Sequence, residues 1–156
     1  MARRADAAFG QLVSRYQDRL FTVAHRLLGN RADAEDAVQR AFLNCYLRAD
    51  RYDPRWQVST WLYRILTNVC VDELRRRRTA GSAVRPPDEE PTDKPGQHVD
   101  LRRALERVPT EARMLLVLRY VDGLSYGELS RVRGISINTV KSQLARGKAI
   151  LRKALR

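Results

Sequence analysis

Six polar side chains lie within nine residues near the C-terminus, at positions that leave one side of a helix apolar. They are Asn138, Thr139, Lys141, Ser142, Gln143 and Arg146. Amides and hydroxyls exchange hydrogen bonds with polar ligands, and Lys and Arg cations neutralise phosphates. The small residues Ala145 and Ala149 would let a helix backbone approach its ligand closely. The set favours a helix that enters the major groove of DNA, with Lys141 and Arg146 contacting phosphates or bases.

Two capped helices joined by a glycine turn are needed to position this set. Ser125 and Glu128 have the spacing of a capping box, Gly134 would end the first helix, and Ser136 would cap the second. The opposite stripe of the second helix is apolar and consists of Val140, Leu144 and Leu151. The segment is thus predicted to be a helix-turn-helix, with an ordinary helical hairpin as the alternative.

The charge of the chain favours a polyanionic partner over that alternative. Residues 101–156 hold thirteen basic and four acidic residues, and the whole chain carries a formal charge of +12 with a pI of about 10.6. A basic strip on a small domain is typical of a surface that faces phosphates. We therefore expect the chain to bind nucleic acid.

Residue types that support enzymatic or metal chemistry are scarce. His25 and His98 are the only histidines, and no acidic or cysteine ligands cluster around either in the sequence. Cys45 and Cys70 lie in apolar helical stretches, which indicates small buried side chains. We expect no metal, no other cofactor and no enzymatic activity. No apolar run approaches the roughly 20 residues of a membrane span. We therefore expect a cytoplasmic location and no membrane partner.

Residues 79–100 divide the chain into two parts. They contain four of the six prolines and five acidic residues against two basic ones, a composition typical of a flexible linker. No strand pattern is present on either side. The sequence predicts an all-α protein with two small helical domains, residues 1–78 and 101–156, of which the second contains the helix-turn-helix.

Apolar residues at helical spacing predict the individual elements. In the first domain helices are expected over residues 8–28, from residue 30 or 31 to before Pro54, and over residues 60–78 with Ser59 as the cap. The second of these helices should place Val38, Phe42, Cys45 and Tyr46 inward. In the second domain two further helices, 101–108 and 111–121, should precede the helix-turn-helix.

Three motifs in this order resemble the extracytoplasmic-function (ECF) sigma factors of the sigma-70 family. The motifs are residues 33–42, residues 60–76 and residues 123–151, and together they span most of the chain. The resemblance implies a first domain that binds core RNA polymerase and opens promoter DNA at the minus-ten element. It also implies a second domain that binds the minus-thirty-five element, and an anti-sigma factor as a further partner.

In this family the helix that contains Asp33, Asp36 and Gln39 meets the polymerase, so these three residues are the expected polymerase contacts. The acidic side chains would also stabilise the start of their helix through its dipole. Arg40 stands where the family usually has an acidic residue, and Gln143 stands where it commonly has arginine. Contacts at these two positions should differ from the family pattern.

The minus-ten strand is expected to lie on the loop between the second and third helices and on the third helix itself. The candidate contacts are Asp53, Arg55, Trp56, Gln57, Arg64, Asn68, Arg75 and Arg76. Aromatic rings stack on extruded bases and arginines follow the backbone. Two alternatives stay open: Trp56 packs inward as an anchor of the loop, and the arginine run is a solvated helix end.

Two other classes of protein share part of this pattern. One is a helix-turn-helix regulator that acts without a polymerase role, and the other is an adaptor whose basic faces bind acidic proteins. A regulator of the first class usually dimerises on two half-sites, and the sequence shows no segment typical of a dimer zipper.

Overall fold

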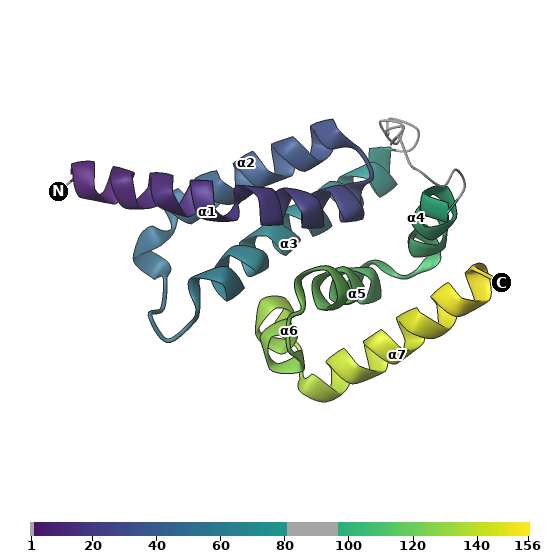
Figure 1. Cartoon of the computed structure of the whole chain (residues 1–156). Coiled ribbons are helices and arrows are strands. Elements are labelled where there is room, and N and C mark those ends of the chain that lie inside the picture. Colours follow the sequence, from purple (N-terminus) through teal and green to yellow (C-terminus); the bar gives the residue numbers. More distant parts are fainter. Residues whose placement is uncertain (1, 81–96) are drawn as a thin grey trace.

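The computed structural model describes residues 2–80 and 97–156, and all regular elements in these ranges are helical (Figure 1). The N-terminal half contains α1 (Ala2–Leu28), α2 (Arg31–Leu47), the short 3-10 helix η1 (Ala49–Arg51) and α3 (Val58–Ala80). The C-terminal half contains α4 (Gln97–Arg107), α5 (Thr110–Asp122), α6 (Tyr126–Arg133) and α7 (Ile137–Ala154). The predicted all-α class is confirmed. Most of the predicted linker, residues 81–96, lies outside the described residues.

Helices α1, α2 and α3 pack against one another and form the N-terminal half. Gly29, with φ of 84°, turns the chain from α1 into α2, a backbone conformation that glycine adopts without strain. The Asn30 side chain caps α2 by accepting a hydrogen bond from the Asp33 N–H at 2.8 Å. Ala37, Val38, Phe42 and Cys45 are buried along the inner face of α2, among other residues.

Two details of the sequence prediction are wrong in this half. Helix α3 begins at Val58, where the Gln57 carbonyl accepts the Trp61 N–H at 3.2 Å, so Ser59 lies inside the helix instead of capping it. Tyr46 is 49% exposed, although its ring touches Phe9 of α1 with ring centroids 5.2 Å apart. It lies at the edge of the core because α2 ends at the next residue.

The C-terminal half follows the predicted capping signals closely. Ser125 and Glu128 form the reciprocal hydrogen bonds of a capping box at 3.1 Å each, Gly134 ends α6 in the left-handed region, and Ser136 caps α7. Helix α7 approaches α5 through Gly147, where a side chain would meet Leu116. The predicted helix-turn-helix of α6 and α7 is therefore present.

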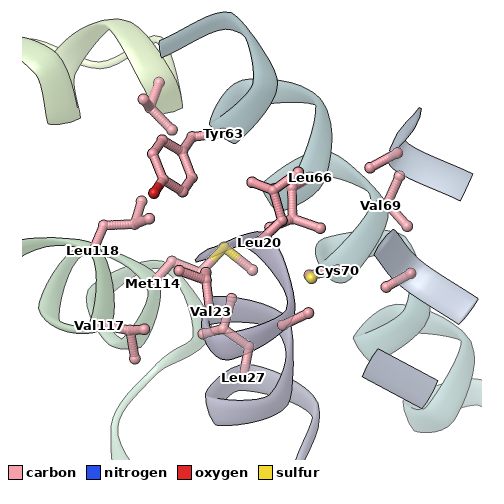
Figure 2. Packing of buried hydrophobic residues seen from close by; sticks show 14 of the residues in the cluster. Leu20, Val23, Leu27, Tyr63, Leu66, Val69, Cys70, Met114, Val117 and Leu118 are labelled. Carbon is pink, nitrogen blue, oxygen red and sulfur yellow. The ribbon is translucent and has the colours of Figure 1, made fainter. Parts of the chain in front are cut away.

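The two halves share one hydrophobic core, with α5 lying against α1 and α6 lying against α3. Five consecutive residues of α5, Met114 to Leu118, are buried, which requires cover on more than one side of the helix. Figure 2 shows Met114 and Leu118 on the side of α5 that faces α1 and Tyr63 of α3. The halves are thus docked onto each other.

Candidate nucleic-acid interface

Helix α7 presents a polar face opposite a buried stripe. Val140, Leu144 and Gly147 are buried against the rest of the C-terminal half, whereas Lys141 and Arg146 are exposed. Asn138 and Ser142 are exposed on the same side, while Thr139 and Gln143 are partly buried. The Ser142 hydroxyl donates to the Thr139 carbonyl at 3.1 Å, and the Thr139 hydroxyl lies 2.9 Å from that of Ser136. The structure therefore brings the six candidate residues together on one helix.

Tyr52 anchors the loop before α3 through both its hydroxyl and its ring. The Tyr52 hydroxyl donates to the Trp56 carbonyl at 2.5 Å, and its ring lies 5.0 Å from that of Trp61. Trp56 is partly exposed, and the Arg64 guanidinium lies over its ring at 5.5 Å. A partly exposed ring beside a cation is an arrangement on which a base can stack.

Asp53 and Arg55 hold each other in place at the tip of this loop. The Arg55 side chain donates to Asp53 Oδ1 at 3.2 Å and to Asp53 Oδ2 at 3.0 and 2.8 Å, and the Arg55 backbone N–H donates to Oδ1 at 3.0 Å. These bonds lower the pKa of Asp53. Gln57 is exposed next to them. The loop has a fixed shape with one exposed ion pair.

On α3 the candidate residues fall into two separate groups. Arg64 and Asn68 lie one turn apart, and both contact α6: Arg64 donates to the Arg131 carbonyl at 3.0 Å and Asn68 accepts from Arg133 at 3.2 Å. Arg75 lies about 16 Å beyond Arg64 along α3, given a rise of about 1.5 Å per residue. Arg76, beside Arg75, is paired with Glu73 at 2.8 Å. The structure does not bring this basic end to the loop.

The outer face of α2 is exposed and mixed in chemistry. Asp36 and Gln39 point to solvent, and Arg40 forms a loose ion pair with Asp36 at 3.6 Å. Leu43 and Leu47 continue the same face and are 56% and 66% exposed. Large exposed apolar side chains beside charges are typical of a protein-binding surface.

Asp33 is not part of this exposed face. Its carboxylate accepts from Arg77 of α3 at 2.5 Å and from the Asn30 side chain at 2.9 Å, and it is 11% exposed. The same arginine also donates to the Leu28 carbonyl at 2.8 Å. This buried ion pair ties the start of α2 to the end of α3, so Asp33 supports the fold.

Sequence reasoning missed two features of the interface. A groove of about 680 Å³ runs between α1 and the start of α3, lined by Arg15, Tyr16, Arg19 and Gln57 among others. Both guanidiniums lie over the Tyr16 ring, at 5.6 and 5.4 Å. In the sequence, the spacing of these two arginines around a tyrosine is the pattern that indicates the groove, whereas the apolar spacing of α1 predicts only a packing role. The second missed feature is the set of contacts between α3 and the C-terminal half.

Cys45 and Cys70 are buried and unpaired, and burial raises their pKa values to about 11 and about 12. No group of three metal-ligating side chains occurs within residues 2–80 and 97–156. Nor is any helix in these ranges long and apolar enough to cross a membrane.

The sequence of the chain matches two family models. Residues 12–80 match sigma-70 region 2 and residues 98–151 match sigma-70, region 4. Relatives that match nearly the whole chain are described as ECF RNA polymerase sigma factors. The chain belongs to the ECF RNA polymerase sigma factors. The match over the N-terminal half supports this family and not the alternative of a helix-turn-helix regulator without a sigma role.

Three relatives show the extent of this likeness. SigW of Bacillus subtilis is 32% identical over 169 residues, which cover 96% of this chain and 89% of the relative. SigE of Mycolicibacterium smegmatis is 35% identical over 156 residues, covering 93% of this chain and 60% of the longer relative. The sigma-E factor of Escherichia coli is 30% identical over 159 residues, covering 90% and 83%.

Two solved structures have the same fold. CnrH, in complex with the cytosolic domain of CnrY, is 29% identical with a TM-score of 0.75, covering 99% of this chain and 93% of that one. The sigma factor RpoE of Bartonella quintana, in complex with the anti-sigma factor NepR, has a TM-score of 0.78 at 23% identity, covering 95% and 96%.

Proposed function

We propose that the chain binds core RNA polymerase and directs it to promoters, with each polar face meeting a different partner. The outer face of α2 binds the polymerase, the loop before α3 and the first turns of α3 bind the opened minus-ten strand, and α7 binds minus-thirty-five duplex DNA. The chain does this as a non-enzymatic subunit without a cofactor, in the cytoplasm where the polymerase acts.

The exposed basic face of α7 is the observation that carries the proposal. Lys141 and Arg146 project from the side opposite the buried Val140 and Leu144, on the second helix of a helix-turn-helix. Such a helix fits the major groove, and each cation that neutralises a phosphate releases a counterion. Asn138 and Ser142 lie on the same face and supply hydrogen bonds to base edges.

The minus-ten contact is proposed for the loop because its shape is already fixed. Tyr52 and the Asp53–Arg55 pair hold the backbone, which leaves Gln57 exposed and Trp56 partly exposed beside Arg64. A base stacked on an aromatic ring gains roughly 1 to 3 kcal/mol, which approaches the cost of extruding it. The protein, and not the polymerase alone, then selects the extruded base. Arg75 and Arg76 would contact the DNA backbone further along.

The polymerase contact is proposed for Asp36 and Gln39 together with the exposed apolar residues that follow them on α2. An anti-sigma factor is a further expected partner, because RpoE, which shares this fold, is described in complex with the anti-sigma factor NepR.

Gel filtration with core polymerase, followed by transcription from fragments selected out of genomic DNA, tests the proposal. The parent chain should co-elute with the core and start transcripts at discrete sites. Lys141→Ala and Arg146→Ala should each weaken binding to the selected upstream duplex and reduce the slope of log affinity against log salt by about one unit.

The matched control is Lys153→Ala, which removes an exposed cation about 18 Å further along α7 than Lys141. The control should leave both the affinity and the salt slope close to those of the parent. Failure of the parent chain to bind the core would contradict the polymerase role. An unchanged salt slope in the first two variants would contradict the assignment to α7.

A further inference from the structure

Helix α6 covers the part of α3 on which the minus-ten strand is proposed to bind. Arg133, in the last turn of α6, extends its guanidinium across to α3 and donates to the Thr67 hydroxyl at 2.9 Å and to the Asn68 amide oxygen at 3.2 Å. Its side chain is only 7% exposed. An arginine this deeply enclosed at the junction of two halves acts as a contact between them.

Arg133 is held in this orientation from its own half of the chain. Glu111 of α5 accepts two hydrogen bonds from the same guanidinium, at 3.0 and 2.6 Å. A bidentate arginine–carboxylate pair fixes the plane of the guanidinium and leaves its remaining donors aimed at α3. The arginine therefore meets Thr67 and Asn68 without losing further side-chain freedom.

The end of α6 also occupies Arg64. The Arg64 guanidinium donates to the Arg131 carbonyl at 3.0 Å, and it lies beside Gly134, which ends the helix. The last carbonyls of a helix carry partial negative charge and lack partners within the helix. On Arg64 the Arg131 carbonyl takes the acceptor position that a phosphate oxygen of DNA would take.

A third polar contact joins the halves at Tyr63, the residue before Arg64. The Tyr63 hydroxyl donates to the Asp122 carboxylate at the end of α5, and burial together with this contact raises the pKa of Tyr63. Below it, Met114 and Leu118 pack toward α1 and α3, as Figure 2 shows. The junction of the two halves thus combines polar contacts from α5 and α6 with a patch of packed apolar side chains.

The covered surface is confined to one of the three proposed binding faces. The cations of α7, Lys141 and Arg146, remain exposed, as do Asp36 and Gln39 on α2. Among the candidate residues that the structure describes on these faces, Arg64 and Asn68 of α3 are the ones that form hydrogen bonds with the opposite half of the chain. In this arrangement the chain can bind duplex DNA and the polymerase surface while the α3 part of its minus-ten face is covered.

We propose that helix α6 competes with single-stranded promoter DNA for α3, with Arg133 as the latch that holds the closed arrangement. This inference rests on the proposed function, because it takes the minus-ten strand as the competing ligand. A closed population that excludes the strand reduces its apparent affinity by the fraction of chains that are open. Promoter opening is then coupled to separation of the two halves.

The test compares the parent chain with Arg133→Gln and Asp122→Asn, each of which removes a contact from the C-terminal side. Neither residue belongs to the proposed DNA face. The control is Arg131→Ala, because Arg64 contacts the Arg131 backbone carbonyl, which that substitution keeps. It removes one exposed cation from the same helix end and leaves the latch intact.

Three measurements are made on each full-length protein. The first is affinity for a pool of short single-stranded DNAs of random sequence, the second is affinity for a duplex pool, and the third is the radius of gyration from small-angle X-ray scattering. Loss of the latch should raise single-strand affinity about tenfold, equivalent to about 1.4 kcal/mol. It should also increase the radius of gyration, while duplex affinity changes little beyond the loss of one charge.

Equal single-strand affinities and equal radii of gyration in the parent and the two latch variants would overturn the proposal. Larger radii in the variants, with no single-strand binding by any protein, would keep the latch and refute the minus-ten role instead. If Arg133→Gln proves unfolded by circular dichroism, Asp122→Asn alone decides, because its partner Tyr63 keeps all its apolar contacts.

Discussion

Replacing Asp33 by asparagine separates a structural role from a partner-binding role within one helix. The substitution keeps the size of the side chain but removes the charge that faces Arg77. Breaking a buried ion pair costs about 3 to 5 kcal/mol when the remaining charge has no other partner. Arg77 keeps the Leu28 carbonyl at 2.8 Å and Glu73 at 3.5 Å, so we expect a loss of about 2 to 3 kcal/mol in the free energy of unfolding.

Urea and thermal unfolding followed by circular dichroism measure this loss. For a chain of this size it should lower the melting temperature by about 5 to 10 °C. The matched control is Asp36→Asn on the same helix, where the side chain is 60% exposed and its pair with Arg40 is loose. The control should change stability by less than about 0.5 kcal/mol but weaken binding to core polymerase. An Asp33→Asn variant as stable as the parent that nevertheless loses polymerase binding would refute this reasoning.

Three further outcomes are expected. Leu118→Ala should lower the free energy of unfolding by about 2 to 4 kcal/mol, because this buried side chain belongs to the core that the two halves share. Calorimetry should show both halves unfolding together at a lower temperature, and two separate transitions would contradict this. Ser125→Ala should destabilise the chain by about 1 kcal/mol through loss of the capping box, while Ser14→Ala, at an exposed site on α1, should not. Cys70 should resist thiol reagents at pH 8 in the folded chain, because burial raises its pKa to about 12 from 9.0. Below pH 9 the Cys70 thiol is protonated in both the folded and the unfolded chain, so the stability that its burial contributes is fully present. As the pH rises from 9 toward 12, the thiol ionises in the unfolded chain first, and this contribution is lost. The free energy of unfolding should therefore fall less steeply over that range in Cys70→Ala.

Features that depend on near neighbours in the chain could be predicted from the sequence. The capping box of Ser125 and Glu128 and the turn at Gly134 are formed by residues a few positions apart, and the structure confirms them. The polar face of α7 follows from helical spacing in the same way. Ser59 was misplaced as a cap because serine is common in that role, and the loop before α3 lets the helix begin earlier, at Val58.

Contacts between distant segments could not be predicted by the same means. The partner of Asp33 is forty-four residues away, and Arg133 meets α3 residues more than sixty positions earlier. An arginine at the end of a helix has the same local pattern whether it faces solvent, DNA or another helix. Only the packing of α5 and α6 onto the N-terminal half distinguishes these cases.

The burial of α5 on more than one side limits how freely the halves of such proteins can be recombined. Its inner residues, such as Leu116, pack on α7, whereas Met114 and Leu118 match the surface of α1 and α3. A hybrid that joins this C-terminal half to the N-terminal half of a relative would place these side chains against a foreign surface. Such hybrids should become soluble and well folded only when the outward residues of α5 are exchanged together with α1.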